Sequence, residues 1–181
     1  MGQTDGRADF REVNILFVRC FLVAALLLLM VCPAWSYRGG EPDRFSDALS
    51  AAAMERTRHN VIYDGSYLSI SYPNGDVPAN IGVCTDVVIR AYRALGVDLQ
   101  QDVHQEMRAH FQAFPARWGL SAPDPNIDHR RVPNLRRFFE RKGLVLPVSQ
   151  EPGDYLPGDL VTWTVAGRLP HIGIVVQEKS R

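Results

Sequence analysis

The stretch "NIGVCTDVVIRAYRALGVDL", residues 80–99, contains the one cysteine that lies beyond the N-terminal apolar segment of the chain. From Cys84 to Gly96, apolar residues recur at three- and four-residue steps, which predicts an amphipathic helix that ends at this glycine. The expected buried stripe consists of Cys84, Val87, Val88, Ala91, Tyr92 and Leu95. The expected outer face carries Asp86, Arg90 and Arg93. The pattern therefore places a thiol at the beginning of a helix and on its apolar side.

The composition is that of a globular domain. The chain has 181 residues, of which 46% are apolar and 22% charged, enough for one domain with a core. Its 20 basic residues balance 20 acidic ones, so we expect no nucleic-acid partner, which normally requires a clustered basic excess. The sequence contains no HExxH or CxxC motif and no glycine-rich phosphate loop. We therefore expect no metal and no cofactor.

The N-terminus has the pattern of a secretory signal peptide. The apolar run "CFLVAALLLLMVC", residues 20–32, is short for a membrane span, which needs about 20 residues. Small residues at Ala34 and Ser36 then predict cleavage after Ser36. The interpretation is a signal peptide at 1–36, a domain at 37–181, and a periplasmic or secreted location. An uncleaved membrane anchor is the alternative, because residues 15–32 are almost all apolar.

Beyond the signal, the chain runs from helices into strands. Helical spacing covers 41–59 and 99–114, and Pro133 opens a further helix that Gly143 closes. Period-two alternation predicts strands at the positions 67–72, 160–165 and 171–176. This order predicts an α+β domain in which helices are followed by an antiparallel sheet.

Cys84 has two interpretations. A helix N-terminus stabilises a thiolate, lowers its pKa, and offers N–H groups that can bind an oxyanion, so Cys84 is a candidate nucleophile. Alternatively, it is a small core residue, because cysteine is among the residue types most often buried.

A nucleophilic cysteine needs a base, and His171 is the best candidate. It begins a predicted strand, and alternation places it on the same face as Gly173, which leaves open space beside the imidazole. The alternative is a histidine at an exposed strand edge. His104 and His110 lie six residues apart, so they do not share a helix face for a metal.

The segment "DPNIDHRRVPNL", residues 124–135, concentrates charge in a predicted loop. Its arginines are suited to bidentate binding of a carboxylate, and its carboxylates can orient a neighbour. The candidate substrate contacts are Asp128, His129, Arg130 and Arg131. The alternative is a salt-bridged loop that organises the helix after it.

Three blocks in this order resemble a bacterial family. They are "YPNGDVPANIGVCTDVVIRAYRALGVDLQ", "NIDHRRVPNL" and "GDLVTWTVAGRLPHIGIV". They are similar to the family called domain of unknown function 1287, and a cysteine at a helix start followed by a "HIGI" strand resembles the NlpC-type, papain-like cell-wall cysteine peptidases. The resemblance implies a papain-like fold, Cys84 as nucleophile, His171 as base, and peptide or amide bonds of bacterial peptidoglycan as substrate.

The chain departs from this family in one respect. Relatives continue beyond the "HIGIV" strand and carry a further polar residue that orients the histidine, whereas this chain ends ten residues after His171. We therefore expect the orienting residue and the C-terminal strands to be missing. This leaves a non-catalytic wall-binding module or a decayed enzyme as the alternative to a hydrolase. Acyl transfer by the same cysteine and histidine is a third possibility.

Overall fold

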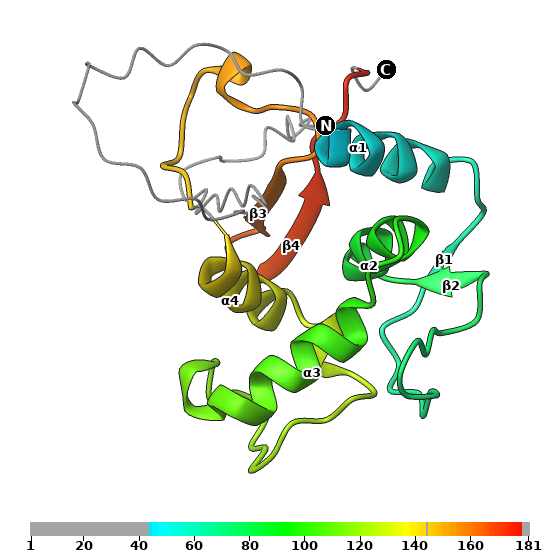
Figure 1. The fold of residues 1–181 in the computed structure, drawn as a ribbon, viewed down its shortest axis with the longest axis vertical. Coiled ribbons are helices and arrows are strands. Elements are labelled where there is room, and N and C mark those ends of the chain that lie inside the picture. The colour runs from blue at the N-terminus through cyan, green and yellow to red at the C-terminus, as the bar shows by residue number, and fades with distance from the viewer. Residues whose placement is uncertain (1–43, 144, 179–181) are drawn as a thin grey trace, which may run out of the picture.

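The computed structural model describes residues 44–143 and 145–178 (Figure 1). The elements follow in the order α1 (Arg44–Arg56), β1 (Ile62–Tyr63), β2 (Ile81–Gly82), α2 (Cys84–Ala94), α3 (Leu99–His110), η1 (Phe111–Ala113), η2 (Asp128–Arg130), α4 (Val132–Lys142), η3 (Pro152–Asp154), β3 (Leu160–Val165) and β4 (Leu169–Ile174). The predicted α+β class is confirmed. The predicted signal peptide at 1–36 lies outside the described residues. Within the described ranges, no helix is long and apolar enough to cross a membrane.

The C-terminal hairpin is the larger of the two small sheets in the described residues. Strands β3 and β4 pair antiparallel, from Leu160 opposite Ile174 to Val165 opposite Leu169. Ala166 and Gly167 both adopt left-handed backbone angles, which a tight turn between antiparallel strands requires. Because the turn is short, β4 begins at Leu169, two residues earlier than the sequence predicted.

The core lies where α1, α2, α3 and α4 meet the hairpin. Figure 1 shows α2 between α1 and α3, with β4 running past α2 and α4. The ring of Tyr92 packs against Phe45 at 5.7 Å and against Phe139 at 5.5 Å, so this one side chain of α2 joins α1 to α4. Ile172 of β4 is buried in the same core, which fixes the hairpin over α2.

The prediction of a strand at 67–72 is wrong. This segment has no neighbouring strand, and its backbone groups instead bind side chains from distant loops and helices. The Ile70 N–H donates to Oδ1 of Asn126 (2.9 Å), and the Ser71 carbonyl accepts a hydrogen bond from Nε2 of Gln100 (2.8 Å). The period-two pattern could not show that side chains, and not a neighbouring strand, bind the backbone of this segment.

Two predictions about the faces of α2 are also wrong. Val87, expected in the buried stripe, is exposed, whereas Val88, Ala91 and Tyr92 are buried as predicted. Asp86 and Arg90, expected on the outer face, are both buried. Charged side chains are buried only when they are paired, and each of these two has a charged partner from another segment.

Candidate active site

Cys84 is the first residue of α2, and the backbone just before it is held in place by two charged side chains of that helix. Oδ2 of Asp86 accepts the N–H of Val83 at 2.7 Å, which satisfies a donor at the helix N-terminus. One turn further along, Arg90 donates to the carbonyl of Ile81 at 3.1 Å and to Asp76 at 3.0 Å. The loop that precedes Cys84 is therefore bound to the helix that Cys84 begins.

Strand β4 passes directly over this helix start. The Cys84 thiol is half-buried, and it interacts with the backbone of Ile172, the residue after His171. The fold thus places the Cys84 thiol beside the strand that carries His171, which lies 87 positions later in the chain.

The expectation that the helix N-terminus lowers the thiol pKa is wrong in this structure. Burial raises the pKa of Cys84 above its ordinary value, although hydrogen bonds with the backbone of Ile172 and Thr85 act in the opposite direction. Removing water from a group disfavours its charged form, and here this outweighs the effect of the nearby donors. Cys84 is therefore a neutral thiol at pH 7.

His171 lies in the middle of β4, directly opposite Trp163 of β3. The two rings pack at 4.6 Å between centroids. Burial lowers the pKa of His171, so its imidazole is neutral at pH 7. In the described part of the chain, no hydrogen bond or ion pair joins His171 to Cys84.

The space that Gly173 was expected to leave open is filled. A Cβ at this position would lie 3.3 Å from the Trp163 ring, which means that the indole covers the glycine and packs beside His171. Trp163 therefore orients the imidazole by contact, where the sequence suggested an empty pocket.

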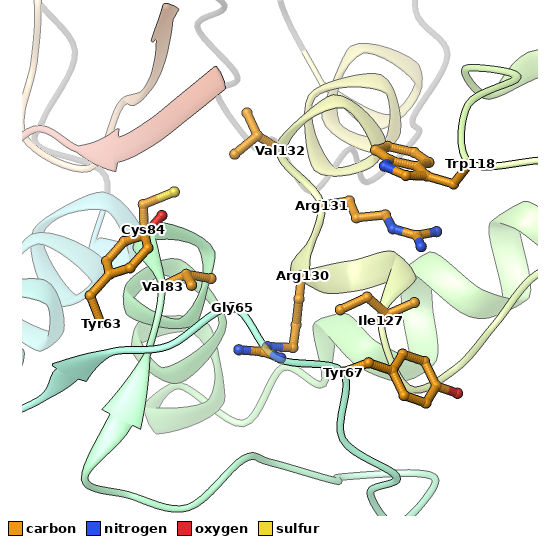
Figure 2. A pocket seen from close by; sticks show the side chains of 10 residues that line it. All are labelled: Tyr63, Gly65, Tyr67, Val83, Cys84, Trp118, Ile127, Arg130, Arg131 and Val132. Atoms are coloured by element: carbon orange, nitrogen blue, oxygen red, sulfur yellow. The ribbon is translucent and has the colours of Figure 1, made fainter. Parts of the chain in front are cut away.

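Cys84 lies in a cleft of about 400 Å³ (Figure 2). The cleft is lined by Tyr63, Gly65, Tyr67, Val83, Cys84, Trp118, Ile127, Arg130, Arg131 and Val132. Of its aromatic residues, Tyr63 ends the two-residue strand β1, while Tyr67 and Trp118 lie in loops, and sequence analysis named none of them as site residues. The side chains of Tyr63 and Tyr67 are exposed, so they form the accessible rim of the cleft.

Arg130 forms part of the cleft wall, but its guanidinium is buried and binds other groups of the protein. Nε and Nη2 donate to the two carboxylate oxygens of Asp86, both at 2.9 Å, and the side chains are 2% and 3% exposed. The same guanidinium reaches the carbonyls of Ser66 (3.3 Å) and Asp64 (3.4 Å). Arg130 does bind a carboxylate bidentately, as its chemistry predicted, but the carboxylate belongs to α2.

Asp128 and His129 are also buried, which fits the alternative of a loop that organises the next helix. Asp128 accepts the N–H of Asp124 at 2.6 Å and a hydrogen bond from Arg131 at 2.8 Å, and burial raises its pKa. Burial lowers the pKa of His129 to about 4. In the described chain its Nδ1 has no hydrogen-bond partner. Neither residue lines the cleft that contains Cys84.

Arg131 is the candidate substrate contact that remains accessible. Its guanidinium lies over the Trp118 ring, 4.1 Å from the centroid. Both residues line the Cys84 cleft and also a second cavity of about 300 Å³ beside α3 and α4. Among the residues that the structure describes, no group of three His, Cys, Asp or Glu side chains is placed to bind a metal.

Comparison with known proteins identifies the family. The family described as "Domain of unknown function (DUF1287)" matches residues 50–181. The chain belongs to this family. It is also similar to "Uncharacterized protein YijF" of Escherichia coli (strain K12), with 47% identity over 128 residues. That alignment covers 71% of this chain and 62% of the relative, so the chain spans less than two thirds of the relative's length. No solved structure gives a significant match.

The first two of the three sequence blocks that resembled this family supply lining residues of the cleft, and the third contacts Cys84 through Ile172. The first block contains the turn before α2 and the helix start with Cys84. The second contains η2 and the beginning of α4, which supply Arg130 and Arg131. The third is the β3–β4 hairpin with His171. Segments that are far apart along the chain therefore meet around Cys84.

Proposed function

We propose that this protein is an exported cysteine hydrolase of the NlpC-type, papain-like kind, which cleaves peptide or amide bonds of bacterial peptidoglycan. One observation carries the proposal. Cys84 stands at a helix N-terminus inside a cleft, and its thiol interacts with the backbone next to His171. A nucleophile, a base on a rigid strand and helix N–H donors close to the nucleophile are the parts that amide hydrolysis by a cysteine needs.

In the proposed reaction, His171 acts first as a general base. Its neutral imidazole accepts the proton of the Cys84 thiol as the sulfur attacks the amide carbonyl carbon. The carbonyl oxygen becomes an oxyanion, which the N–H of Cys84 stabilises. The C–N bond then breaks, the imidazolium returns its proton to the leaving amine, and a thioester remains. A water molecule, deprotonated by His171, hydrolyses the thioester and restores the thiol.

The protonation states of the free protein suit this order of events. Many cysteine hydrolases hold a thiolate and an imidazolium before substrate binds. Here burial raises the pKa of Cys84 and lowers the pKa of His171, so the pair is neutral at pH 7. Proton transfer therefore accompanies attack, and it requires the His171 imidazole to come within hydrogen-bonding distance of the sulfur.

A non-catalytic module that binds cell-wall peptides is the second candidate. It is favoured by the neutral thiol and by the lack, within the described residues, of a direct bond between Cys84 and His171. In that case the cleft with its exposed tyrosines holds a peptide without cleaving it.

The two candidates are separated by incubating the full chain with purified bacterial sacculi and analysing released fragments by mass spectrometry. We expect the wild type to release peptide fragments, and Cys84→Ala and His171→Ala to lose the activity by 100-fold or more. His110→Ala is the matched control, because this histidine is exposed and its ion pair in the described residues is with Glu106. Retention on sacculi without any fragments from the wild type would contradict hydrolysis and support the binding module.

Export is tested separately. The N-terminal sequence of the protein recovered from bacterial cells should begin at Tyr37 if cleavage follows Ser36. Recovery of the uncut chain in the membrane fraction would support an anchor instead.

A further inference from the structure

The second cavity, of about 300 Å³, lies beside α3 and α4, and Cys84 does not line it. Its inner part is formed by buried side chains, among them Met107 and Phe114. The exposed residues Arg117, Trp118 and Leu120 form its mouth. A cavity of this size that opens to solvent is large enough for a small organic molecule.

Aromatic rings make up much of the wall of this cavity. Phe111, Phe114 and Trp118 line it, and Met107 of α3 adds a thioether sulfur. Aromatic side chains pack well against another flat ring, through offset-stacked or edge-to-face contacts, and a methionine sulfur also makes favourable contacts with rings. The lining therefore suits a ligand that contains an aromatic ring.

Asn134 of α4 supplies a polar group to the same cavity. Its side chain is buried, and its Nδ2 donates to the carbonyl of Asp128 at 3.2 Å. In the described part of the chain, its Oδ1 has no hydrogen-bond partner. Exchanging the two amide atoms would not satisfy the group, because Oδ1 would then face the Asp128 carbonyl oxygen. A buried acceptor without a donor costs free energy, so an N–H or O–H of a ligand gains a hydrogen bond here.

The charges beside Asn134 favour an uncharged ligand. Asp128 lines the cavity, but its carboxylate oxygens already accept hydrogen bonds from the Asp124 N–H (2.6 Å) and from Arg131 (2.8 Å). A cationic ligand would lie beside Arg131 and an anionic one beside Asp128, so neither charge is favoured inside the cavity. Arg117 is exposed at the mouth, where water and salt screen its charge.

We propose that this cavity binds a small uncharged aromatic compound with an N–H or O–H donor, and that the donor binds Oδ1 of Asn134. The aromatic lining holds the ring, and the acceptor on Asn134 selects for the donor. The proposal does not depend on hydrolysis by Cys84. Such a ligand would nevertheless touch Trp118 and Arg131, which line both this cavity and the Cys84 cleft.

Indole and benzofuran are the probes, because they have the same shape and differ in one ring atom. Indole carries an N–H donor, and benzofuran has an oxygen in its place. Each is titrated into the full isotope-labelled chain and followed by proton–nitrogen correlation NMR, which reports affinity and location together. We expect indole to bind with a dissociation constant of about 1 mM or below. The shifts should appear at the backbone amides of residues 111–121 and at the side-chain amide of Asn134. Benzofuran should bind about threefold to tenfold more weakly, since it lacks one neutral hydrogen bond.

Two variants separate the hydrogen bond from the cavity itself. Asn134→Leu removes the acceptor and should make the two affinities equal. Ala116→Trp fills the cavity from its exposed mouth and should abolish binding of both compounds. Ala51→Trp is the matched control, since Ala51 is exposed on α1 and does not line the cavity. If Asn134→Leu does not fold, the comparison of the two compounds in the wild type and the Ala116→Trp result still decide the proposal.

Several outcomes would overturn the proposal. These are equal affinities of the two compounds in the wild type, a preference for indole that survives Asn134→Leu, and binding that survives Ala116→Trp. No binding of indole at millimolar concentration would do the same. Shifts confined to Tyr63 and Tyr67 would place indole in the Cys84 cleft and would also contradict it.

Discussion

Replacing Arg130 by methionine should destabilise the fold far more than an arginine substitution usually does. Methionine keeps most of the apolar volume, so the main effect is that Asp86 loses its partner while it stays 3% exposed. Breaking a buried ion pair from one side costs about 3–5 kcal/mol of unfolding free energy. The lost contacts to the carbonyls of Ser66 and Asp64 add little, because they are long. For a domain of this size, we expect a fall in melting temperature of roughly 10–15 °C.

Urea unfolding followed by circular dichroism measures this effect, with Arg136→Met as the control. Arg136 is 40% exposed and pairs with Glu140 four residues away, so its loss should cost about 0.5 kcal/mol or less. The double variant Asp86→Asn/Arg130→Met should recover part of the stability, because no unpaired charge remains inside. If Arg130→Met costs no more than the control, or if the double variant is no more stable than Arg130→Met, the reasoning about this pair is wrong.

Two further predictions concern stability. The pKa of His129 is about 4 in the folded chain and about 6.5 when unfolded, so between these values the unfolded chain binds more protons. The unfolding free energy should therefore be highest above pH 6.5 and fall by up to about 3 kcal/mol as the pH drops to 4. His129→Gln should remove this part of the pH dependence. If the unfolding free energies of both proteins change with pH in parallel, the prediction is wrong. A Cβ on Gly75 would lie 1.9 Å from the Ser71 carbonyl oxygen, so Gly75→Ala should cost about 2–3 kcal/mol, whereas Gly153→Ala, which meets open space, should change the unfolding midpoint little.

Elements whose apolar faces repeat locally were predictable from sequence. The bounds of α2 and α4 were predicted to within about two residues. Helix periodicity depends on neighbours three and four positions away, so the apolar residues of each helix were enough to locate it. Alternation located β3 correctly for the same reason. In each case the information that decides the structure lies within one element.

Features that depend on distant partners could not be predicted. Asp86 looks like a surface residue of a helix until Arg130 is placed beside it, and the two are 44 positions apart. The segment that contains Ile70 lacks a strand partner because Asn126, 56 positions away, satisfies its backbone. Trp118, which supports Arg131, lies in a loop without periodicity. Cys84 was singled out for its chemistry, but most of the cleft around it was not predicted.

Arg90 and Arg130 bind carboxylates at different sequence separations, and this difference sets the order in which the two ion pairs form during folding. Arg90 binds Asp76 across 14 positions, whereas Arg130 binds Asp86 across 44. Loop-closure entropy makes the longer closure costlier by about 1 kcal/mol. The unit with Cys84 and its preceding loop can therefore form early, before the segment around Arg130 docks and completes the cleft. The same segment should be the first to open, so amide hydrogen exchange should be faster there than in α2.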